Sequence, residues 1–354
     1  MVALHGGGDQ VWLAGTVGST RSAWVAVTEV RPAGYQQSMS DLIVTLTLNP
    51  AVDLASSADA VIPIHKVRTT DEHIDPGGGG INVARVIHAL GGETLALVLG
   101  GGATGRLIEE LLRDAGVPAI ILPMAGRTRV SLTVYDQRAH QEYRFVPEGP
   151  EVTRNEWHAV QEKLELTDGG WLVASGSLPR GLPVDAYAQV ARIATRRGMR
   201  VVLDTSGEPL RAALHTGLAL IKPSLRELEQ LVGKALPDAA SQAEEAMKLV
   251  RAGAARMVAV TLGANGALLA TPDGVTRMAA LSGPVRSAVG AGDAFLASMV
   301  LALSRGLAPK TALAWGIAAG VAAVEGVGTA RVSLAAVEAC FRRLQSPASV
   351  SSSA

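Results

Sequence analysis

The chain has little cysteine, few aromatic residues and no net charge. Cys340 is the one cysteine among 354 residues, and aromatic side chains make up 3%. A single cysteine excludes an intrachain disulfide and favours a reducing, cytoplasmic compartment. Lys and Arg together number 32, as do Asp and Glu, so the formal net charge is +0. This balance gives no electrostatic basis for binding nucleic acid or an acidic membrane.

Long apolar runs are also missing, since none approaches the roughly 18 residues that a membrane span needs. The first 38 residues show no sustained period, and Asp9 interrupts their early apolar stretch, which argues against a signal peptide. We expect residues 1–40 to be an extension that is disordered or not translated. The Ser-rich tail, 346–354, is expected to be disordered.

Between these ends, strand and helix patterns alternate in one domain, 41–345. Alternation of this kind predicts an α/β fold with a doubly wound, mainly parallel sheet and helices on both faces. Residues 60–76 and the hairpin pattern within 128–147 predict a small separate β-sheet. In such folds ligands bind beyond the carboxyl ends of the strands, so polar residues and glycines just after strands are the candidates for a site.

The stretch from Val289 to Phe295 is the strongest of these candidates. Gly290, Ala291 and Gly292 crowd before Asp293, and an apolar helical pattern follows. A glycine-rich turn that opens a helix directs unpaired N–H groups and partial positive charge at one spot. Asp293 beside that spot would act as a general base, which suits phosphoryl transfer to an alcohol. The alternative is that Asp293 merely caps the helix.

Three further glycine-rich turns have two interpretations each. Gly77 to Gly80 precede Asn82 at a predicted helix start, where bare backbone could approach a ligand or simply form a turn. The run 100–105 resembles a dinucleotide fingerprint, but no acidic residue closes a strand about 20 residues on, which disfavours a dehydrogenase. The turn from Gly263 to Gly266 could cradle a phosphate or form an ordinary hairpin.

Polar and charged side chains near the other turns also have two interpretations each, and for Ser224 and Glu227 the sequence favours the first. Ser224 and Glu227 fit a helix capping box, or a position near a nucleotide and Mg²⁺ together with Lys222. Arg129 and Arg144 lie on the two arms of the predicted hairpin. They could grip a phosphate, or serve as solvated surface charges.

Taken together, these motifs resemble the PfkB family of ribokinase-like carbohydrate kinases, from about Leu42 to Leu344. The family's two signatures correspond to the segment from Gly77 to Arg85 and to Gly290 to Asp293. Within the family the similarity is closest to the minor 6-phosphofructokinases of bacteria. The resemblance implies transfer of phosphate from ATP, with Mg²⁺, to O1 of fructose 6-phosphate. 1-Phosphofructokinase and tagatose-6-phosphate kinase, which usually have a lysine within the Gly77–Gly80 run, are the alternatives, followed by a non-catalytic sugar-phosphate sensor.

The resemblance also implies a role for each matching position. Asp293 would be the catalytic base, and the amides of Gly290, Ala291 and Gly292 would form the anion hole. The sugar phosphate would be held by Asp53, Gly78, Gly79, Asn82, Arg129, Arg144 and Ser177. The nucleotide would be held by Lys222, Ser224, Glu227, Thr261, Gly263 and Gly266. A monovalent cation such as K⁺ would be bound by a loop containing Ser287, Val289, Ala323, Gly326, Gly328 and Ala330.

The resemblance implies two further features. The small sheet would form a lid through which two copies pair as a homodimer. At Ser224 the chain departs from the family, which has asparagine in an Asn-x-x-Glu motif. Serine is shorter, so a direct contact with nucleotide phosphates or the metal's water shell is less readily made there.

Overall fold

The computed structural model describes residues 13–15, 23–25, 42–283, 289–325 and 332–345. The chain divides into two units, Met1–Ser38 and Met39–Ala354. In the first unit, β1 (Leu13–Gly15) pairs antiparallel with β2 (Ala23–Val25). Most of the predicted extension and the whole predicted tail lie outside the described residues, so the interpretation of both stays a prediction.

The larger sheet of the second unit is built as the alternating pattern predicted. All neighbouring strands are parallel except the pairs β13–β14 and β14–β15, which are antiparallel. Across this sheet the order is β15 (Gly274–Met278), β14 (Ala267–Thr271), β13 (Met257–Thr261), β12 (Leu220–Ile221), β11 (Arg200–Asp204), β10 (Trp171–Ser175), β3 (Ile43–Thr47), β6 (Thr94–Gly100) and β7 (Ala119–Pro123). The central strands are almost continuously apolar, as expected for strands buried on both faces.

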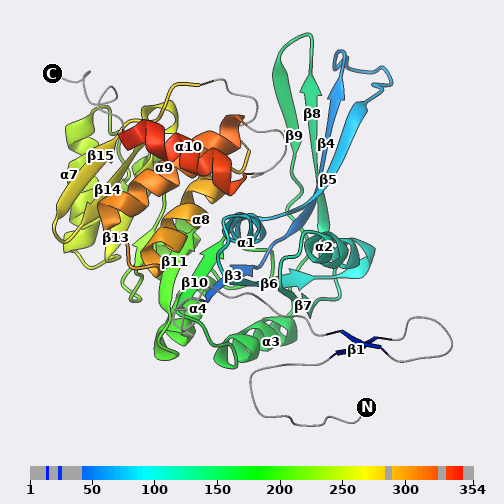
Figure 1. Ribbon diagram of the computed structural model, residues 1–354, viewed down its shortest axis with the longest axis horizontal. Helices are drawn as coiled ribbons and strands as arrows, with labels where there is room; N and C mark the ends of the chain where they lie inside the picture. The colour runs from blue at the N-terminus through cyan, green and yellow to red at the C-terminus, as the bar shows by residue number, and fades with distance from the viewer. Residues whose placement is uncertain (1–12, 16–22, 26–41, 284–288, 326–331, 346–354) are drawn as a thin grey trace. The chain divides into compact units, whose positions relative to one another are not determined.

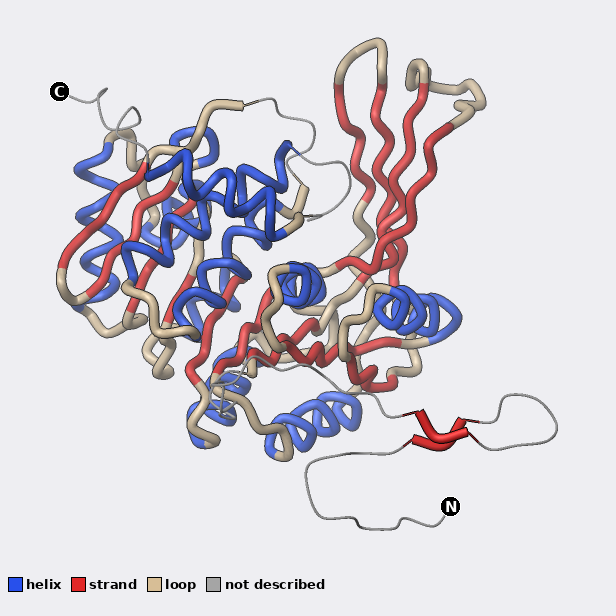
Figure 2. The backbone as a smooth tube through the Cα atoms, viewed as in Figure 1, coloured by secondary structure: helices blue, strands red, loops and turns tan. Residues whose placement is uncertain are grey.

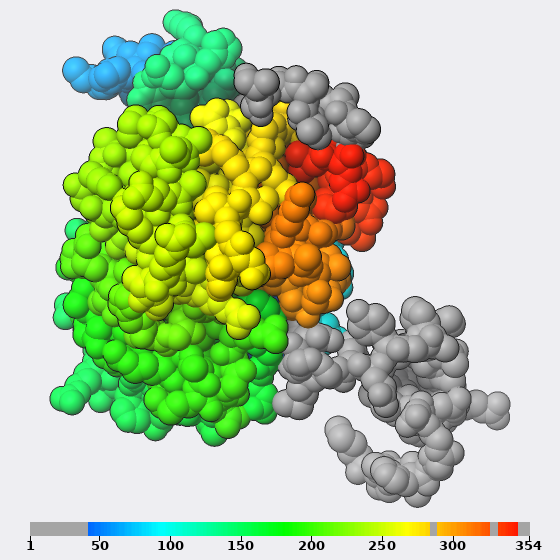
Figure 3. Space-filling model, turned by 90° about the vertical axis from the view of Figure 1, so that its left-hand side faces the viewer, coloured from blue at the N-terminus to red at the C-terminus, as the bar shows by residue number. Residues whose placement is uncertain are grey.

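Helices cover both faces of this sheet (Figure 1). One face is packed by α1 (Gly79–Ala89), α2 (Gly102–Asp114), α8 (Ala291–Ser304), α9 (Pro309–Glu325) and α10 (Leu334–Gln345). The other is packed by α3 (Arg154–Glu165), α4 (Ala186–Arg196), α5 (Gly207–Ala213), α6 (Leu225–Val232) and α7 (Ala239–Arg251). Figure 3 shows α9 in orange and α10 in red beside the yellow region of β14 and β15. No described helix is both long and apolar enough to cross a bilayer.

Successive side chains of a strand point to opposite faces of the large sheet and pack into the hydrophobic core on each face. Val44, Leu46 and Leu48 belong to the core beneath α3 to α7, whereas Ile43 packs with α1 and α8. Helix α8 is buried all round from Ala294 to Leu303, where Ser298 is the one polar residue, because the sheet, α1 and α9 surround it. This burial holds the amino end of α8 in a fixed position.

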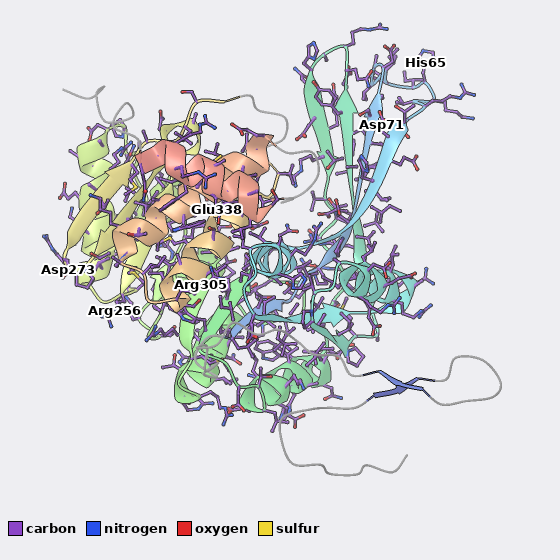
Figure 4. The ribbon with its side chains drawn as sticks, in the orientation of Figure 1. His65, Asp71, Arg256, Asp273, Arg305 and Glu338 are labelled. Atoms are coloured by element: carbon purple, nitrogen blue, oxygen red, sulfur yellow. The ribbon has the colours of Figure 1, made fainter. Side chains whose placement is uncertain are left out.

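The smaller sheet has the order β5 (Thr70–Gly77), β4 (Ala51–Ala58), β8 (Arg129–Asp136) and β9 (Gln141–Phe145). It projects from the body of the unit (Figure 2), and His65 and Asp71 lie at its outer end (Figure 4). The hairpin at 128–147 is confirmed. Of the other predicted segment, 60–76, only the part from Thr70 onward is a strand, and 60–69 connects β4 to β5. Strand β4 was missed because its Ala-Ser-Ser-Ala end has weak strand propensity.

Candidate active site

The amino end of α8 forms the centre of the site, as the sequence predicted. Gly290 is the N-cap and adopts a left-handed conformation, with φ of 78°, that glycine adopts without strain. Helix α8 then begins at Ala291, and the amides of its first turn have no partner within the helix. Asp293 lies in this first turn. It does not cap the helix, because the N-cap is Gly290 and no side chain caps this end. Instead, Asp293 Oδ2 accepts a hydrogen bond from Asn82 Nδ2 at 2.8 Å.

The Asp293 carboxyl has an unusually high proton affinity. Burial is the main cause, the negative charge of Asp204 adds to it, and together they raise the pKa of Asp293 to about 7. The hydrogen bond from Asn82 and the charge of Lys222 act in the opposite direction. A carboxylate with this pKa can accept a proton from an alcohol near neutral pH and release it again, which is what a general base requires.

A polar pocket of about 400 Å³ opens on one side of Asp293. Its wall combines the start of α1, the inner ends of the small sheet and the loop after β10. All seven residues predicted to hold a sugar phosphate line this pocket: Asp53, Gly78, Gly79, Asn82, Arg129, Arg144 and Ser177. They come from five segments that lie far apart in the sequence, and the structure brings them together. Their individual roles stay predictions.

The glycine run at the start of α1 allows the main chain to pass very close to neighbouring strands. A Cβ atom on Gly79 would lie 2.1 Å from Ser175 Oγ, and one on Gly80 would lie 2.6 Å from the carbonyl oxygen of Leu46. Gly78 has φ of +120°, which side chains rarely tolerate. The run is therefore more than a turn, because each of these glycines is needed to bring α1 against the sheet.

Two charged groups of the small sheet face this pocket in different ways. Arg129 donates to three main-chain carbonyls, those of Asn49 at 2.9 Å, Pro147 at 2.7 Å and Pro50 at 3.4 Å. These bonds fix its guanidinium at the pocket wall. Asp53 is partly buried there, and burial raises its pKa to about 6 against the lowering charges of Arg144 and Arg129.

A second pocket, of about 560 Å³ and mainly apolar, opens on the other side of the α8 amino end. Ala291 and Gly292 belong to its wall, as do four residues predicted to hold a nucleotide: Ser224, Thr261, Gly263 and Gly266. Phe295, Ile317 and Val321 supply apolar surface. The purine base of a nucleotide prefers such surroundings, and the phosphates of that nucleotide would point to the amides at the helix end.

Ser224 and Glu227 form the capping box of α6. Glu227 N donates to Ser224 Oγ at 3.3 Å, and Ser224 N donates to Glu227 Oε2 at 2.7 Å. The capping interpretation is therefore confirmed. It does not displace the other one, because Ser224 lines the apolar pocket and Glu227 lines the polar pocket.

Lys222 lies on the wall of neither pocket. It is buried and forms an ion pair with Asp204, with Nζ 3.1 Å from Oδ1. Burial acts to lower the pKa of Lys222, but the charge and hydrogen bond of Asp204 outweigh it and raise that pKa. A Cβ atom on Gly292 would lie 3.5 Å from Lys222 Nζ, so this ammonium lies directly beneath the first turn of α8. It places positive charge beneath the amides of that turn.

Three polar residues of the site were missed by the sequence analysis: Asp204, Ser175 and Asn49. Asp204 ends β11, and Ser175 Oγ donates to its Oδ2 at 3.2 Å. Asn49 Nδ2 donates to Ser177 Oγ at 3.1 Å. Each follows or ends a predicted strand, so its position at the carboxyl edge of the sheet was the available signal.

The predicted cation loop is described only in part. Ser287, Gly326, Gly328 and Ala330 lie outside the described residues. Val289 lines the polar pocket, and Ala323 is buried in α9. Among the described residues, no three histidine, cysteine or acidic side chains converge as metal ligands would.

Comparison with known proteins agrees with this geometry. The family model for pfkB family carbohydrate kinases matches residues 46–335. The chain is a member of the PfkB carbohydrate kinase family. The kinase is 42% identical over 321 residues to ATP-dependent 6-phosphofructokinase isozyme 2 of Mycobacterium tuberculosis, covering 90% of this chain and 94% of the relative. It is 31% identical over 284 residues to 1-phosphofructokinase of Bacillus subtilis, covering 79% and 92%.

The fold of the kinase is also that of solved family members. A crystal structure of phosphofructokinase-2 from Escherichia coli in complex with potassium superimposes with a TM-score of 0.83 at 35% identity. The match covers 86% of this chain and 99% of the other. The predicted ribokinase-like architecture, with a large mainly parallel sheet and a smaller one, is confirmed.

Proposed function

We propose that the kinase transfers the terminal phosphoryl group of ATP to O1 of fructose 6-phosphate, giving fructose 1,6-bisphosphate and ADP. One observation supports this most strongly. The helix end that carries Asp293 separates a polar pocket with two arginines from an apolar pocket suited to a nucleotide. A phosphorylated sugar and a nucleotide that occupied these pockets would meet at the first turn of α8.

The residues around that turn supply a base and an anion hole. Asp293 removes the proton from the O1 hydroxyl as the new O–P bond forms and the bond from the γ-phosphorus to its bridging oxygen breaks. Asn82 orients the carboxylate. The amides of Gly290, Ala291 and Gly292, with the positive end of the α8 dipole, stabilise charge on the phosphoryl oxygens in transit. Lys222 adds its charge from below.

ATP would be accompanied by Mg²⁺, which neutralises charge on the phosphates. This ion is usually held by one or two carboxylates together with the phosphates of its nucleotide. Glu227 and Asp204 both line the polar pocket, and their oxygen ligands fit that requirement. We propose that these two carboxylates hold the ion, directly or through water. K⁺ binding by the loop around Val289 and Ala323 is a further proposal, supported by the potassium complex of the E. coli relative.

The sugar phosphate is proposed as fructose 6-phosphate because of the 42% identity to a 6-phosphofructokinase, against 31% to a 1-phosphofructokinase. The test is ADP release measured with fructose 6-phosphate, fructose 1-phosphate and tagatose 6-phosphate side by side. The highest kcat/KM is expected for fructose 6-phosphate. A higher value for either of the other two would reassign the substrate, and no ADP release with any of them would support a sensor.

We propose further that two copies pair through the lid. The face of the small sheet that points away from Asp53 carries Ile74, Val130, Leu132 and Phe145, which are 46%, 37%, 38% and 57% exposed. A contiguous apolar face of this kind is typical of a protein interface. A dimer is expected by light scattering, and Leu132→Asp should convert it to a monomer. A cytoplasmic location stays a prediction.

A further inference from the structure

Two carboxylates lie side by side where the lid joins the body. Asp53 on β4 and Asp75 on β5 are direct partners in the antiparallel ladder, so their side chains share one face. Cβ atoms of such partners are about 4.5–5.5 Å apart, and like charges directly opposite each other are unfavourable. Asp53 faces the sugar pocket, whereas Asp75 belongs to the buried inner end of β5.

Arg85 reaches this place from the neighbouring helix. It lies on α1, one turn after Asn82, and its NH2 group is 3.0 Å from Asp75 Oδ1. The Arg85 and Asp75 side chains are only 12% and 8% exposed, so solvent screens this ion pair little. The pair therefore ties the inner end of β5 to α1, the helix that begins with the proposed sugar-binding glycines.

We propose that Arg85 and Asp75 form a positioning pair that keeps the Asp53 carboxylate ionised and available to the sugar hydroxyls. The inference rests on the proposed function, because it assigns Asp53 to the sugar. Without the guanidinium, the negative charge of Asp75 would be less compensated where it faces Asp53. Two carboxylates that share one site hold a proton between them much more readily than a single one does.

The charges around Asp53 make this balance sensitive. Five groups on five elements act on it: Asp75 on β5, Arg85 on α1, Arg129 on β8, Arg144 on β9 and Asp293 on α8. Burial holds the pKa of Asp53 at about 6, with Asp75 raising it and the three arginines lowering it. An ionised Asp53 accepts hydrogen bonds with both oxygens, whereas the protonated form loses acceptor capacity. Arg85 is the weakest of the three lowering charges, and its loss would raise the pKa of Asp53 further.

The test is a charge cycle on the pair, with binding of fructose 6-phosphate in the absence of nucleotide measured by calorimetry across pH. Arg85→Gln should move the acidic limb of the affinity profile up by about 0.5–1 pH unit. Asp75→Asn should move it down, and the double variant should return it close to the wild-type position. Arg85→Lys, which keeps the charge, should stay near wild type. Titration of the substrate's own phosphate is common to all four variants and cancels in the comparison.

A purely structural role gives a different result. If Arg85→Gln weakens binding by one factor at every pH, or the double variant fails to restore the limb, the proposal is wrong. If Arg85→Gln does not fold, the affinity profiles of Asp75→Asn and of the double variant can still be compared. The difference between their acidic limbs measures the effect of the Arg85 charge on Asp53. Failure of the proposed function is distinguishable, because wild type would then release no ADP with fructose 6-phosphate. The same cycle is in that case measured with whichever of fructose 1-phosphate and tagatose 6-phosphate binds.

Discussion

Replacing Asp293 by asparagine tests the proposed chemistry most directly, because it removes a proton acceptor while keeping the shape of the side chain. In the wild type, Asn82 Nδ2 donates to Asp293 Oδ2 at 2.8 Å. A carboxamide oxygen can accept the same hydrogen bond, so the helix end should keep its geometry. The reaction loses its general base, which contributes about 10²–10⁴-fold to the rate. We expect kcat to fall by about this factor, with a much smaller change in KM for the sugar phosphate.

The same substitution has a predicted effect on stability, and its sign follows from the raised pKa. The pKa of Asp293 rises from an ordinary 3.8 to about 7 in the folded protein. Between these values the folded state retains a proton that the unfolded state has released, so stability falls as pH rises through this window. Three pKa units correspond to at most about 4 kcal/mol above pH 7. Asparagine does not ionise, so a variant with asparagine at this position does not lose this stability as pH rises.

The variant should therefore be more stable than wild type in mildly alkaline buffer, by up to that amount, and nearly equal to it close to pH 4. ADP release measures the kinetic effect, and urea unfolding across pH measures the stability. Asp293→Glu is a useful companion, since it keeps the charge but moves the carboxylate. Turnover near the wild-type value in Asp293→Asn would refute the role of the base. A variant that is less stable than wild type in alkaline buffer would refute the electrostatic account.

Three further substitutions have defined outcomes. Gly77→Ala should raise KM for the sugar phosphate, because the new Cβ would lie 2.2 Å from Asp53 Oδ2 and displace that carboxylate; an unchanged KM would remove Asp53 from the sugar site. Asn82→Ala removes a hydrogen bond that lowers the pKa of Asp293, so the acidic limb of kcat should move up by about one pH unit. If the acidic limb of kcat does not move at saturating sugar phosphate, the hydrogen bond from Asn82 does not control the pKa of Asp293. Ser224→Ala should cost about 1 kcal/mol of unfolding free energy through the lost cap, whereas Ser224→Asn should cost little. Equal losses in urea unfolding would contradict the capping role.

Local sequence signals predicted the amino end of α8 well. A glycine-rich turn followed by an apolar run is visible within about one dozen residues, and its consequence, an exposed row of amides beside Asp293, follows from helix geometry alone. The glycine run before Asn82 was predicted for the same reason. In both places the main-chain conformation shapes the site, so the prediction depended on few side-chain contacts.

Interactions between distant segments were harder to predict. The ion pair of Lys222 with Asp204 joins the ends of neighbouring strands, and nothing local in the sequence separates it from a nucleotide contact. The sequence left Arg129 open between a phosphate contact and a solvated surface charge, and it did not predict that the guanidinium donates to the carbonyl of Asn49, 80 residues away in sequence. Strand β4 was missed since pairing with β5 and β8, rather than its own residues, makes it a strand.

Helix geometry explains why one turn can serve both pockets. Successive residues of an α-helix are about 100° apart around its axis, so positions three apart share a side and the two between them face elsewhere. Gly290 and Asp293 accordingly line the polar pocket, while Ala291 and Gly292 line the apolar one. In the proposed reaction the base would therefore face the acceptor, and Ala291 and Gly292 would lie on the donor side. Because α8 is buried from Ala294 to Leu303, directly after this turn, the body of the helix anchors its amino end between the two pockets.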